Sequence, residues 1–549
     1  MTRSFRASLV CFLPWGMGLV LALLASGAPV VAQNLLAVAG AGLDEPFDTA
    51  PAERARSVPA PDRSRAKPAP APEPGRFPAG EPDVPLFPEG IEWGEGPVDV
   101  AQYVEESTRT ILPPAAGRGG IDEEVDRRIE ARLGGIPRPR YFPATDFAPP
   151  HGLLLYREDK RTGEFPFALA VSGFLQLRWL EFARGATSWT NAAGTELPIS
   201  NINAFSLNRY LLMFSGHVVD ERLVYAFALF GTSNSGVNTG LAPLGLAGWK
   251  FGPEATVGIG VSMLPGSREF LDGSPWTIGV DRSMANTFFR PGASPGVAAL
   301  GALAEGTLHY QAGVYNSIDA GGANVLLRRG TSMAWVGNVC WEPLGKFGLG
   351  YSDMEHHADP AIRVGTSGVF APNTRALPVP GFNPENTIVR LSDGTPLAIK
   401  GSLVPGATVD AFDYRLATVD AGWKWRGVSL NAEYYFRFLD GFTFAANDPP
   451  LPLPPSHVGL LDHGGAGYLG WCFIPRTWEV YARSSAVTGP FGTGQEYGGG
   501  INRYIHKSRQ GRLTLEAIHM LRNPAQNILY PYRAGATGTA IQTQLVVAF

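Results

Sequence analysis

The sequence predicts an all-β chain whose main part is a transmembrane antiparallel β-barrel of about 16 strands. From about residue 165 to residue 549, apolar and polar residues alternate with a period of two, which is the pattern of a strand with one apolar face. No apolar run after the N-terminus reaches the roughly 20 residues that a membrane helix needs. Because only helices and closed barrels satisfy every backbone polar group in lipid, a spanning structure in this chain has to be a barrel.

The stretch Ser429–Asp440 shows the alternation most clearly. One face carries Leu430, Ala432, Tyr434, Phe436 and Phe438, and the other carries Asn431, Glu433, Tyr435 and Arg437. A soluble β-sandwich alternates in the same way. Tryptophans near the expected strand ends favour the barrel, because aromatic girdles mark the two membrane interfaces. These are Trp179, Trp249, Trp335, Trp341, Trp471 and Trp478.

The C-terminal residues predict a last strand with one apolar face. Ile541, Leu545, Val547 and Phe549 share that face. A last strand that stops on an aromatic residue resembles the signal of the bacterial barrel-insertion machinery. We therefore expect Phe549 to be a C-terminal insertion signal and that machinery to be a partner.

Three segments precede the expected barrel, which is assigned to 165–549. Residues 1–32 read as a signal peptide, with Arg3 and Arg6 before an apolar stretch; an N-terminal membrane anchor is the alternative. Residues 33–95 form a Pro/Ala-rich linker that cannot bury a core and is expected to be disordered. Residues 96–164 are expected to be periplasmic, with a short helix over 121–133. That helix would either oligomerise or pack on the barrel rim.

Composition and cysteine spacing exclude several functions. The net charge is −4, and no basic run is interleaved with aromatic residues, so nucleic acid is not an expected partner. Cys11 lies in the expected signal peptide, and Cys340 and Cys472 lie in expected strands with no metal or disulfide spacing.

Two Pro-rich stretches, His356–Pro405 and Ala445–Leu460, are expected to be extracellular loops.

No catalytic, cofactor or metal site is predicted. His356 and His357 lie close to Asp353, Glu355 and Asp359, but adjacent histidines in a polar loop are more often solvated than metal-bound. A Gly-x-Ser-x-Gly string spans 292–296. Its Ser294 is followed by Pro295, which lacks the backbone N–H that an oxyanion hole requires at that position.

From about Gly173 onward the chain resembles the phosphate-selective porin O and P family. The resemblance lies in a sequence of short motifs. They are Pro265-Gly-Ser-Arg-Glu-Phe-Leu271, Asp281-Arg-Ser-Met-Ala-Asn-Thr-Phe-Phe-Arg-Pro291, Gly301-Ala-Leu303, Tyr310-Gln-Ala-Gly-Val-Tyr-Asn316, Trp335-Val-Gly-Asn338 and Glu342-Pro-Leu-Gly-Lys346. The resemblance implies a sixteen-stranded trimeric porin in which basic side chains line a narrow lumen and pass anions. Carried onto this chain, it makes Arg268, Arg282 and Arg290 candidates for the pore constriction.

The residues around these arginines allow a second interpretation. Glu269, Asp272 and Asp281 lie beside them, so ion pairs that brace a loop are an alternative to an anion path. Further charged residues are expected to face the lumen from the barrel wall. These are Lys424, Arg426, Glu433, Arg437, Arg483, Arg512 and Glu516.

The leading functional prediction is a passive diffusion channel in the bacterial outer membrane, with a periplasmic N-terminus and possible anion or phosphate preference. Its expected partners are outer-membrane lipid, small anions or other small solutes, and two further copies in a homotrimer. Two alternatives remain open. One is a structural barrel that tethers the envelope through residues 33–95, and the other is an outer-membrane barrel enzyme.

Overall fold

The computed structural model describes residues 153–158, 166–233, 240–319, 333–377, 382–446, 448, 453–526 and 533–549. The expected signal peptide, linker and helix over 121–133 lie outside these residues, as does Cys11. No helix among the described residues is long and apolar enough to cross a membrane.

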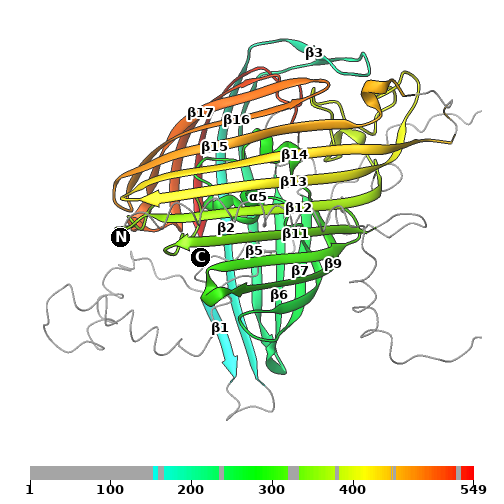
Figure 1. Ribbon diagram of the computed structural model, residues 1–549. Coiled ribbons are helices and arrows are strands. Elements are labelled where there is room, and N and C mark those ends of the chain that lie inside the picture. The colour runs from blue at the N-terminus through cyan, green and yellow to red at the C-terminus, as the bar shows by residue number, and fades with distance from the viewer. Residues whose placement is uncertain are drawn as a thin grey trace, which may run out of the picture. The chain divides into compact units, whose positions relative to one another are not determined.

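Seventeen strands form one antiparallel sheet, and sixteen of them close into a ring (Figure 1). The prediction of a sixteen-stranded barrel is therefore confirmed. The ring strands are β2 (Phe167–Arg184), β5 (Ile202–Val218), β6 (Asp220–Thr232), β7 (Gly240–Lys250), β8 (Thr256–Met263), β9 (Ala293–Leu303), β10 (Leu308–Tyr315), β11 (Ala334–Leu344), β12 (Ala361–Arg375), β13 (Val409–Trp425), β14 (Val428–Phe444), β15 (Leu460–Ile474), β16 (Trp478–Gly489), β17 (Gly492–Tyr504), β18 (Gly511–Leu521) and β19 (Gly538–Ala548).

Each ring strand pairs with the next strand of the ring, and the ring closes where β19 pairs with β2. Beyond the last ladder pair, Phe549 and Gly173 exchange both backbone hydrogen bonds at 3.0 Å. A Cβ atom on Gly173 would lie 2.4 Å from the carbonyl oxygen of Leu211 and 2.9 Å from the Phe549 ring. Only glycine fits at this position, so the chain end is built into the closure of the barrel.

Three further strands lie outside the ring. β1 (Leu153–Glu158) pairs with the first residues of β2. It falls within the segment predicted to precede the barrel, which extends the sheet further toward the N-terminus than expected. β3 (Ser188–Thr190) and β4 (Glu196–Pro198) form a small hairpin between β2 and β5.

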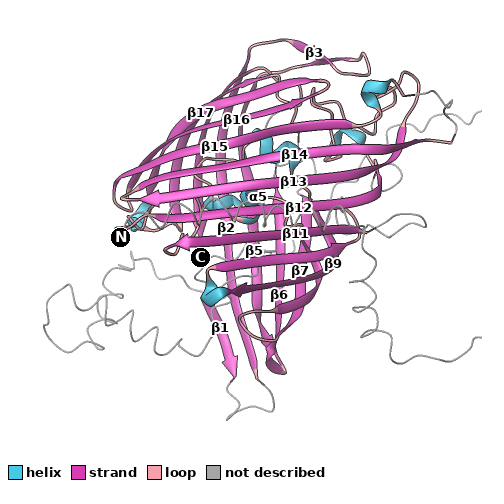
Figure 2. Cartoon of the chain, viewed as in Figure 1, coloured by secondary structure: helices cyan, strands magenta, loops and turns pink. Residues whose placement is uncertain are grey.

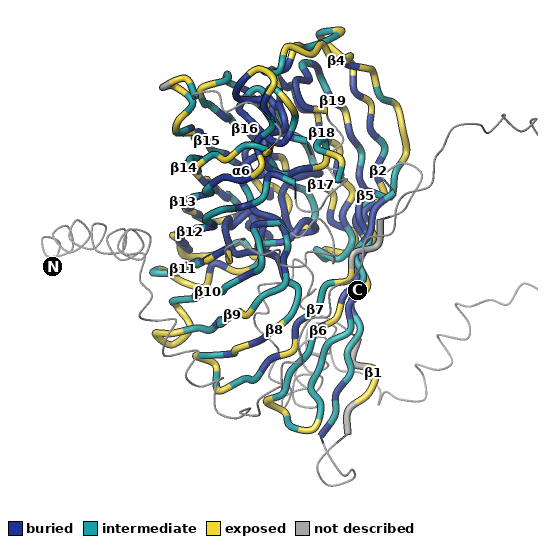
Figure 3. The backbone as a smooth tube through the Cα atoms, turned by 90° about the vertical axis from the view of Figure 1, so that its right-hand side faces the viewer, coloured by how far each residue is buried: buried dark blue, intermediate teal, exposed yellow. Residues whose placement is uncertain are grey.

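The wall alternates as the sequence predicts. In β14, Leu430 and Phe436 are about half exposed on the outer face, whereas Glu433 and Arg437 are buried inside. Tubes coloured by burial show the same contrast between the wall and the interior (Figure 3). A barrel with an apolar exterior and a polar interior is suited to lipid outside and polar groups within.

The helical elements are short, and several lie inside the ring of strands (Figure 2). They are α5 (Arg268–Leu271), α6 (Met284–Phe289) and the 3₁₀ turns η1 (Ser274–Trp276), η2 (Ala304–Gly306), η3 (Pro384–Asn386), η4 (Pro455–His457) and η5 (Ile505–Lys507).

We call the end of the barrel where Phe549 lies the C-terminal rim and the other end the opposite rim. The stretch His356–Pro405, expected to be one loop, contains β12 and is therefore divided between the two rims. The expectation was wrong because β12 is rich in small residues, such as Gly365 and Ser367, which weaken the contrast between its faces. The second stretch does contain a connection, between β14 and β15 at the opposite rim.

Candidate functional site

The lumen is crossed by residues 264–292, which connect β8 to β9 and which we call the constriction segment. Nearly all of its residues are buried. Two serine caps begin its helices: the Ser267 hydroxyl accepts from the Phe270 amide, and the Ser283 hydroxyl accepts from the Asn286 amide. Such caps satisfy amides that the first helical turn leaves without a partner. The segment is thus a folded element inside the barrel.

Glu433 of β14 anchors the first part of the constriction segment. Its carboxylate accepts hydrogen bonds from the backbone amides of Arg268 at 2.8 Å and Glu269 at 3.0 Å, and from the Ser267 hydroxyl at 3.2 Å. Glu269 continues the network inward, because its carboxylate accepts from the Ser283 amide at 2.6 Å and from Tyr468 at 2.5 Å. Glu433 therefore holds the start of α5 against the barrel wall, and Glu269 links α5 to the residue that caps α6.

Arg268, the first constriction candidate, is fully buried and engaged with the wall. Its guanidinium lies 3.0 Å from Asp272 and 3.7 Å from Asp420 of β13. It also donates to the Asn431 side chain at 2.8 Å and lies over the ring of Tyr351 at 4.7 Å. These contacts correspond to the bracing interpretation rather than to an arginine facing open solvent.

Arg282 and Arg290, the other two candidates, lie against one aromatic ring. Their guanidinium carbons are 5.1 and 4.2 Å from the centre of the Phe270 ring. Arg282 also donates to the carbonyl oxygens of Glu269 at 3.1 Å and Phe270 at 3.2 Å. Arg290 is half-buried, whereas Arg282 is buried. The structure thus brings these two cations together and places Arg268 apart from them.

Asp281 fixes the second part of the constriction segment. Its carboxylate lies 2.7 Å from Arg178 of β2 and 2.6 Å from Arg209 of β5, and all three side chains are at most 5% exposed. Arg483 of β16 donates to the Asp281 carbonyl at 2.8 Å, and Arg512 of β18 donates to the Thr277 carbonyl. The sequence analysis noted Asp281, Arg483 and Arg512 but missed Arg178 and Arg209, because residues so far from Asp281 in the chain give no local signal.

A second inward segment, which we call the rim segment, spans 345–360 between β11 and β12 at the C-terminal rim. The Tyr351 amide donates to the Trp276 carbonyl at 3.4 Å, so the rim segment contacts the constriction segment directly. Lys424 of β13 holds it by donating to the Phe347 carbonyl at 3.1 Å. Ser352 donates to Glu479 of β16 at 2.8 Å. No local pattern in the chain predicted that this connection folds inward.

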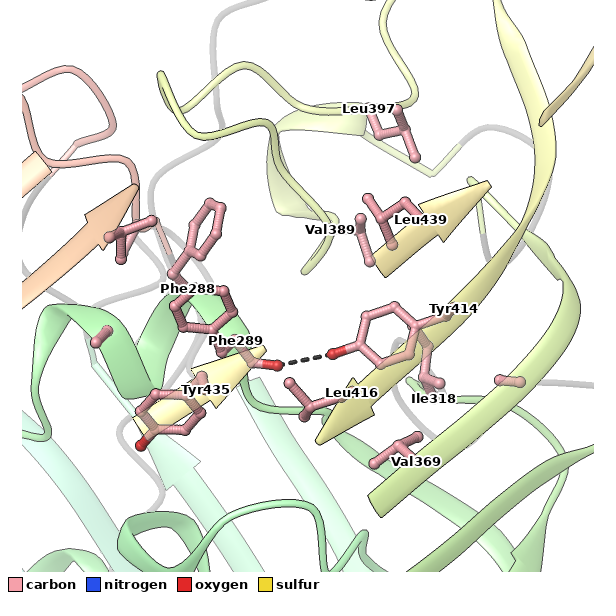
Figure 4. Close-up of a cluster of buried hydrophobic side chains, with 14 of the residues drawn as sticks. Phe288, Phe289, Ile318, Val369, Val389, Leu397, Tyr414, Leu416, Tyr435 and Leu439 are labelled. Carbon is pink, nitrogen blue, oxygen red and sulfur yellow. Dashed lines mark hydrogen bonds between the residues drawn. The ribbon is translucent and has the colours of Figure 1, made fainter. Parts of the chain in front are cut away.

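A third inward segment is the connection between β12 and β13, residues 376–408, at the opposite rim. Its Val389 and Leu397 join an apolar cluster with Phe288 and Phe289 of α6 (Figure 4). Within this cluster the Tyr414 hydroxyl of β13 donates to the Phe289 carbonyl at 2.7 Å. The part of the lumen beside β13 to β15 is therefore packed as a core.

The wall residues predicted to face the lumen are placed as follows. The buried side chains on the inner face are Lys424, Glu433, Arg437, Arg483, Arg512 and Glu516. Arg426 differs from the prediction. It lies in the two-residue turn between β13 and β14 with a φ of 49°, is exposed, and lies 4.8 Å over the Trp425 ring. The alternation that suggested an inward orientation ends one residue earlier.

The polar cluster near the adjacent histidines is an ion-pair network. Ligand atoms of Asp353, Glu355 and His357 lie within 4.8 Å of one another. Asp353 is 2.5 Å from His357 and accepts from the Gly427 amide at 2.7 Å. Arg509 lies 2.7 Å from Glu355. Because these atoms already have partners, the cluster gives no argument for a metal.

Comparisons with known proteins give only a similarity of fold. No protein-family model matches the chain, and no curated protein does. Among solved structures, the anion-selective porin from Comamonas acidovorans is 10% identical with a TM-score of 0.43, covering 70% of this chain and 100% of that one. The outer-membrane protein OmpT of Vibrio cholerae is 10% identical with a TM-score of 0.41, covering 70% and 98%. The outer-membrane channel DcaP of Acinetobacter baumannii is 9% identical with a TM-score of 0.40, covering 70% and 97%. Similarity of this degree does not establish a shared function.

Proposed function

We propose that the chain is a passive outer-membrane channel for small polar solutes. The observation that carries the proposal is a closed ring of sixteen strands, apolar outside and charged inside, with a folded segment across the lumen. A barrel of this size leaves an aqueous channel unless it is plugged. In the proposed arrangement the C-terminal rim and the N-terminus are periplasmic, Phe549 guides insertion, and three copies form a trimer.

Anion preference forms a finer part of the proposal, with phosphate as the first anion to test. Arg282 and Arg290 on the Phe270 ring are its proposed carriers, whereas Arg268 is proposed to hold the segment. Charge held in a narrow part of a channel selects ions of the opposite sign. The guanidinium group is suited to this because it matches the oxygens of phosphate and carboxylate.

The test is conductance of the refolded chain in a planar bilayer, with the reversal potential measured under a salt gradient. We expect stable current steps and a reversal potential that favours anions. Arg282→Ala should reduce the anion preference while the barrel stays folded. Arg415→Ala is the matched control, because the Arg415 side chain is 40% exposed and pairs with Asp440 away from the constriction segment. Unchanged selectivity of the Arg282 variant would show that this arginine is only a brace.

A structural role is the second candidate, and the packed core beside β13 to β15 favours it. A barrel that only tethers the envelope needs no open lumen. It would show no current steps in a correctly folded state. In that case, deletion of residues 33–95 should weaken the envelope.

We propose no enzymatic activity. Ser294 of the Gly-x-Ser-x-Gly string is buried at the start of β9, and its hydroxyl accepts from the Ser317 amide at 3.2 Å. The residue that follows is Pro295, which has no N–H to offer a reacting oxygen. The variant Ser294→Ala should therefore leave any hydrolytic activity of the membrane fraction unchanged.

A further inference from the structure

The C-terminal rim carries arginines stacked on tryptophans. In three places a guanidinium carbon lies 4.8 Å from the centre of an indole ring. The pairs are Arg222 over Trp249, Arg426 over Trp425, and Arg503 over Trp478. Stacking holds the side chain in place and leaves the edge of the guanidinium, with its N–H donors, able to bind an anion.

The turns between β13 and β18 add further cations at this rim. Arg476 lies in the turn between β15 and β16, and Lys507 in the turn between β17 and β18. Both are exposed, and their φ angles are 56° and 58°. Arg426 has a φ of 49°. Glycine or asparagine adopts this conformation more easily, but Val219, Ala304 and Glu305 on the far arc share it, so it belongs to the tight turns of this rim.

We call Arg426, Arg476, Arg503 and Lys507 the cationic rim patch. Among the described residues, none of the four forms an ion pair with a carboxylate. Arg509, which follows close behind in the chain, is different because it is bonded to Glu355 at 2.7 Å. The patch therefore presents positive charge that the described part of the chain does not neutralise.

The same rim has a different character on the far arc, between β5 and β10. There Arg222 lies 2.9 Å from Asp220, so its charge is neutralised although it stacks on a tryptophan. Glu221, Glu254 and Glu305 are exposed in the turns of that arc. Among the described residues of this rim, the exposed cations other than Arg222 thus lie between β11 and β18, where Lys346 and Asp359 of the rim segment are also exposed, whereas the far arc carries more carboxylates and a half-buried Lys250.

Bulky apolar side chains lie next to the patch on the outer face. Trp471 is 53% exposed, Ile474 45% and Ile505 39%. Strands β13 to β18 are consecutive neighbours (Figure 1), and neighbouring strands lie about 4.8 Å apart, so successive turns of the patch are about 10 Å apart. Cations directly beside apolar and aromatic groups are the composition of a surface at the boundary between lipid tails and headgroups.

We propose that the cationic rim patch binds the phosphate groups of anionic phospholipids in the adjacent leaflet. Guanidinium and ammonium groups supply charge-assisted hydrogen bonds to phosphate oxygens, and the neighbouring indole and alkyl groups contact the acyl chains. Basic residues near a membrane surface attract anionic lipid strongly enough for selective enrichment. The inference rests on the proposed membrane location, and it names a lipid class and one arc of the barrel as its binding site.

The test uses the full chain reconstituted in phosphatidylcholine vesicles that contain a trace of spin-labelled lipid. Electron paramagnetic resonance measures the fraction of the label that the protein surface immobilises. One series carries spin-labelled phosphatidylglycerol and the other spin-labelled phosphatidylcholine. We expect the wild-type chain to prefer the anionic probe about fivefold at low salt, and the preference to fall in 1 M NaCl because salt screens exposed charge.

The triple variant Arg426→Gln, Arg476→Gln, Lys507→Gln should lower the preference to below about twofold, because Arg503 alone remains of the patch. The control Asp220→Asn, Arg222→Gln removes both members of a rim ion pair, so the net charge is kept and the preference should be unchanged. An equal association of both probes with the wild-type chain, or an unchanged preference in the triple variant, would overturn the proposal. If neither probe is immobilised, the chain has no lipid-facing surface. The proposed membrane location then fails together with this inference.

Discussion

The ion pairs of Asp281 with Arg178 and Arg209 allow a direct test of whether the constriction segment controls the lumen. The substitution Asp281→Asn keeps the size of the side chain and removes the charge that two wall arginines share. Because both guanidinium groups are at most 5% exposed, the variant leaves two buried cations without their counter-charge. Removing one partner of a buried ion pair costs about 3–5 kcal/mol.

The lost free energy destabilises the constriction segment in its position against β2 and β5. A change of about 3 kcal/mol corresponds to a factor of more than about a hundred in the ratio of docked to undocked segment. We therefore expect Asp281→Asn to conduct with larger or noisier current steps than the wild-type chain in a planar bilayer. The heat-induced shift of the barrel in electrophoresis reports whether the variant is folded.

The matched control is Asp440→Asn, which makes the same chemical change outside the lumen. Asp440 receives two hydrogen bonds of 2.7 Å from Arg415, but the two side chains are 28% and 40% exposed. Such exposed pairs contribute only about 0–1 kcal/mol. If folded Asp281→Asn conducts like this control and like the wild-type chain, the constriction segment does not limit the current.

Three further predictions concern the anchor, the lipid face and acid. Glu433→Gln replaces one of the two oxygens that accept from segment amides by an NH2 donor, at a cost of about 1–3 kcal/mol for the amide left without an acceptor, and faster tryptic cleavage after Arg268 in the folded barrel would reveal it. Phe436→Lys places a charge on an outward residue that is 47% exposed at the middle of β14, and should destabilise the inserted barrel by about 2–4 kcal/mol in urea titrations. Burial raises the pKa of Glu355, but its ion pair with Arg509 lowers the pKa more, so the net direction is downward. The pair therefore stabilises the rim segment above the ordinary glutamate pKa and is lost as pH falls through the lowered value. The protection of the amides over 345–360 from hydrogen exchange, relative to the intrinsic rate at each pH, should fall in acid, and Arg509→Gln should remove that dependence.

Some of the architecture was predictable because a wall with an apolar outer face and a polar inner face has a period of two in every strand. In Ser429–Asp440 the contrast between Phe436 and Arg437 is strong, and the strand was assigned correctly together with its inner and outer faces. Where the contrast is weak the same rule failed. In β12, small residues such as Gly365 and Ser367 fill positions that face the interior, so the strand was taken for part of a loop.

The candidate site was predictable only as a list of residue types. The polar stretch with Arg268, Arg282 and Arg290 was identified, and so was the possibility that nearby carboxylates brace it. The contacts of each arginine could not be predicted from the chain, because the residues that bind Arg268 from the wall are remote in sequence. Asp420 lies 3.7 Å from Arg268 in space but far from it in the chain, and no local pattern encodes such a pair.

The sequence by itself determined the period of the strands, their approximate number and which face of each strand is apolar, since each of these follows from neighbours in the chain. Tertiary structure alone decided that residues 264–292, 345–360 and 376–408 fold inward. It also decided that Arg178, Arg209 and Asp281 meet. The physical reason is that every strand of the wall follows the same rule, with alternate residues facing inward and outward. The lumen, in contrast, is filled by contacts between segments far apart in the chain. Their energies depend on distance and burial, which exist only once the ring has closed.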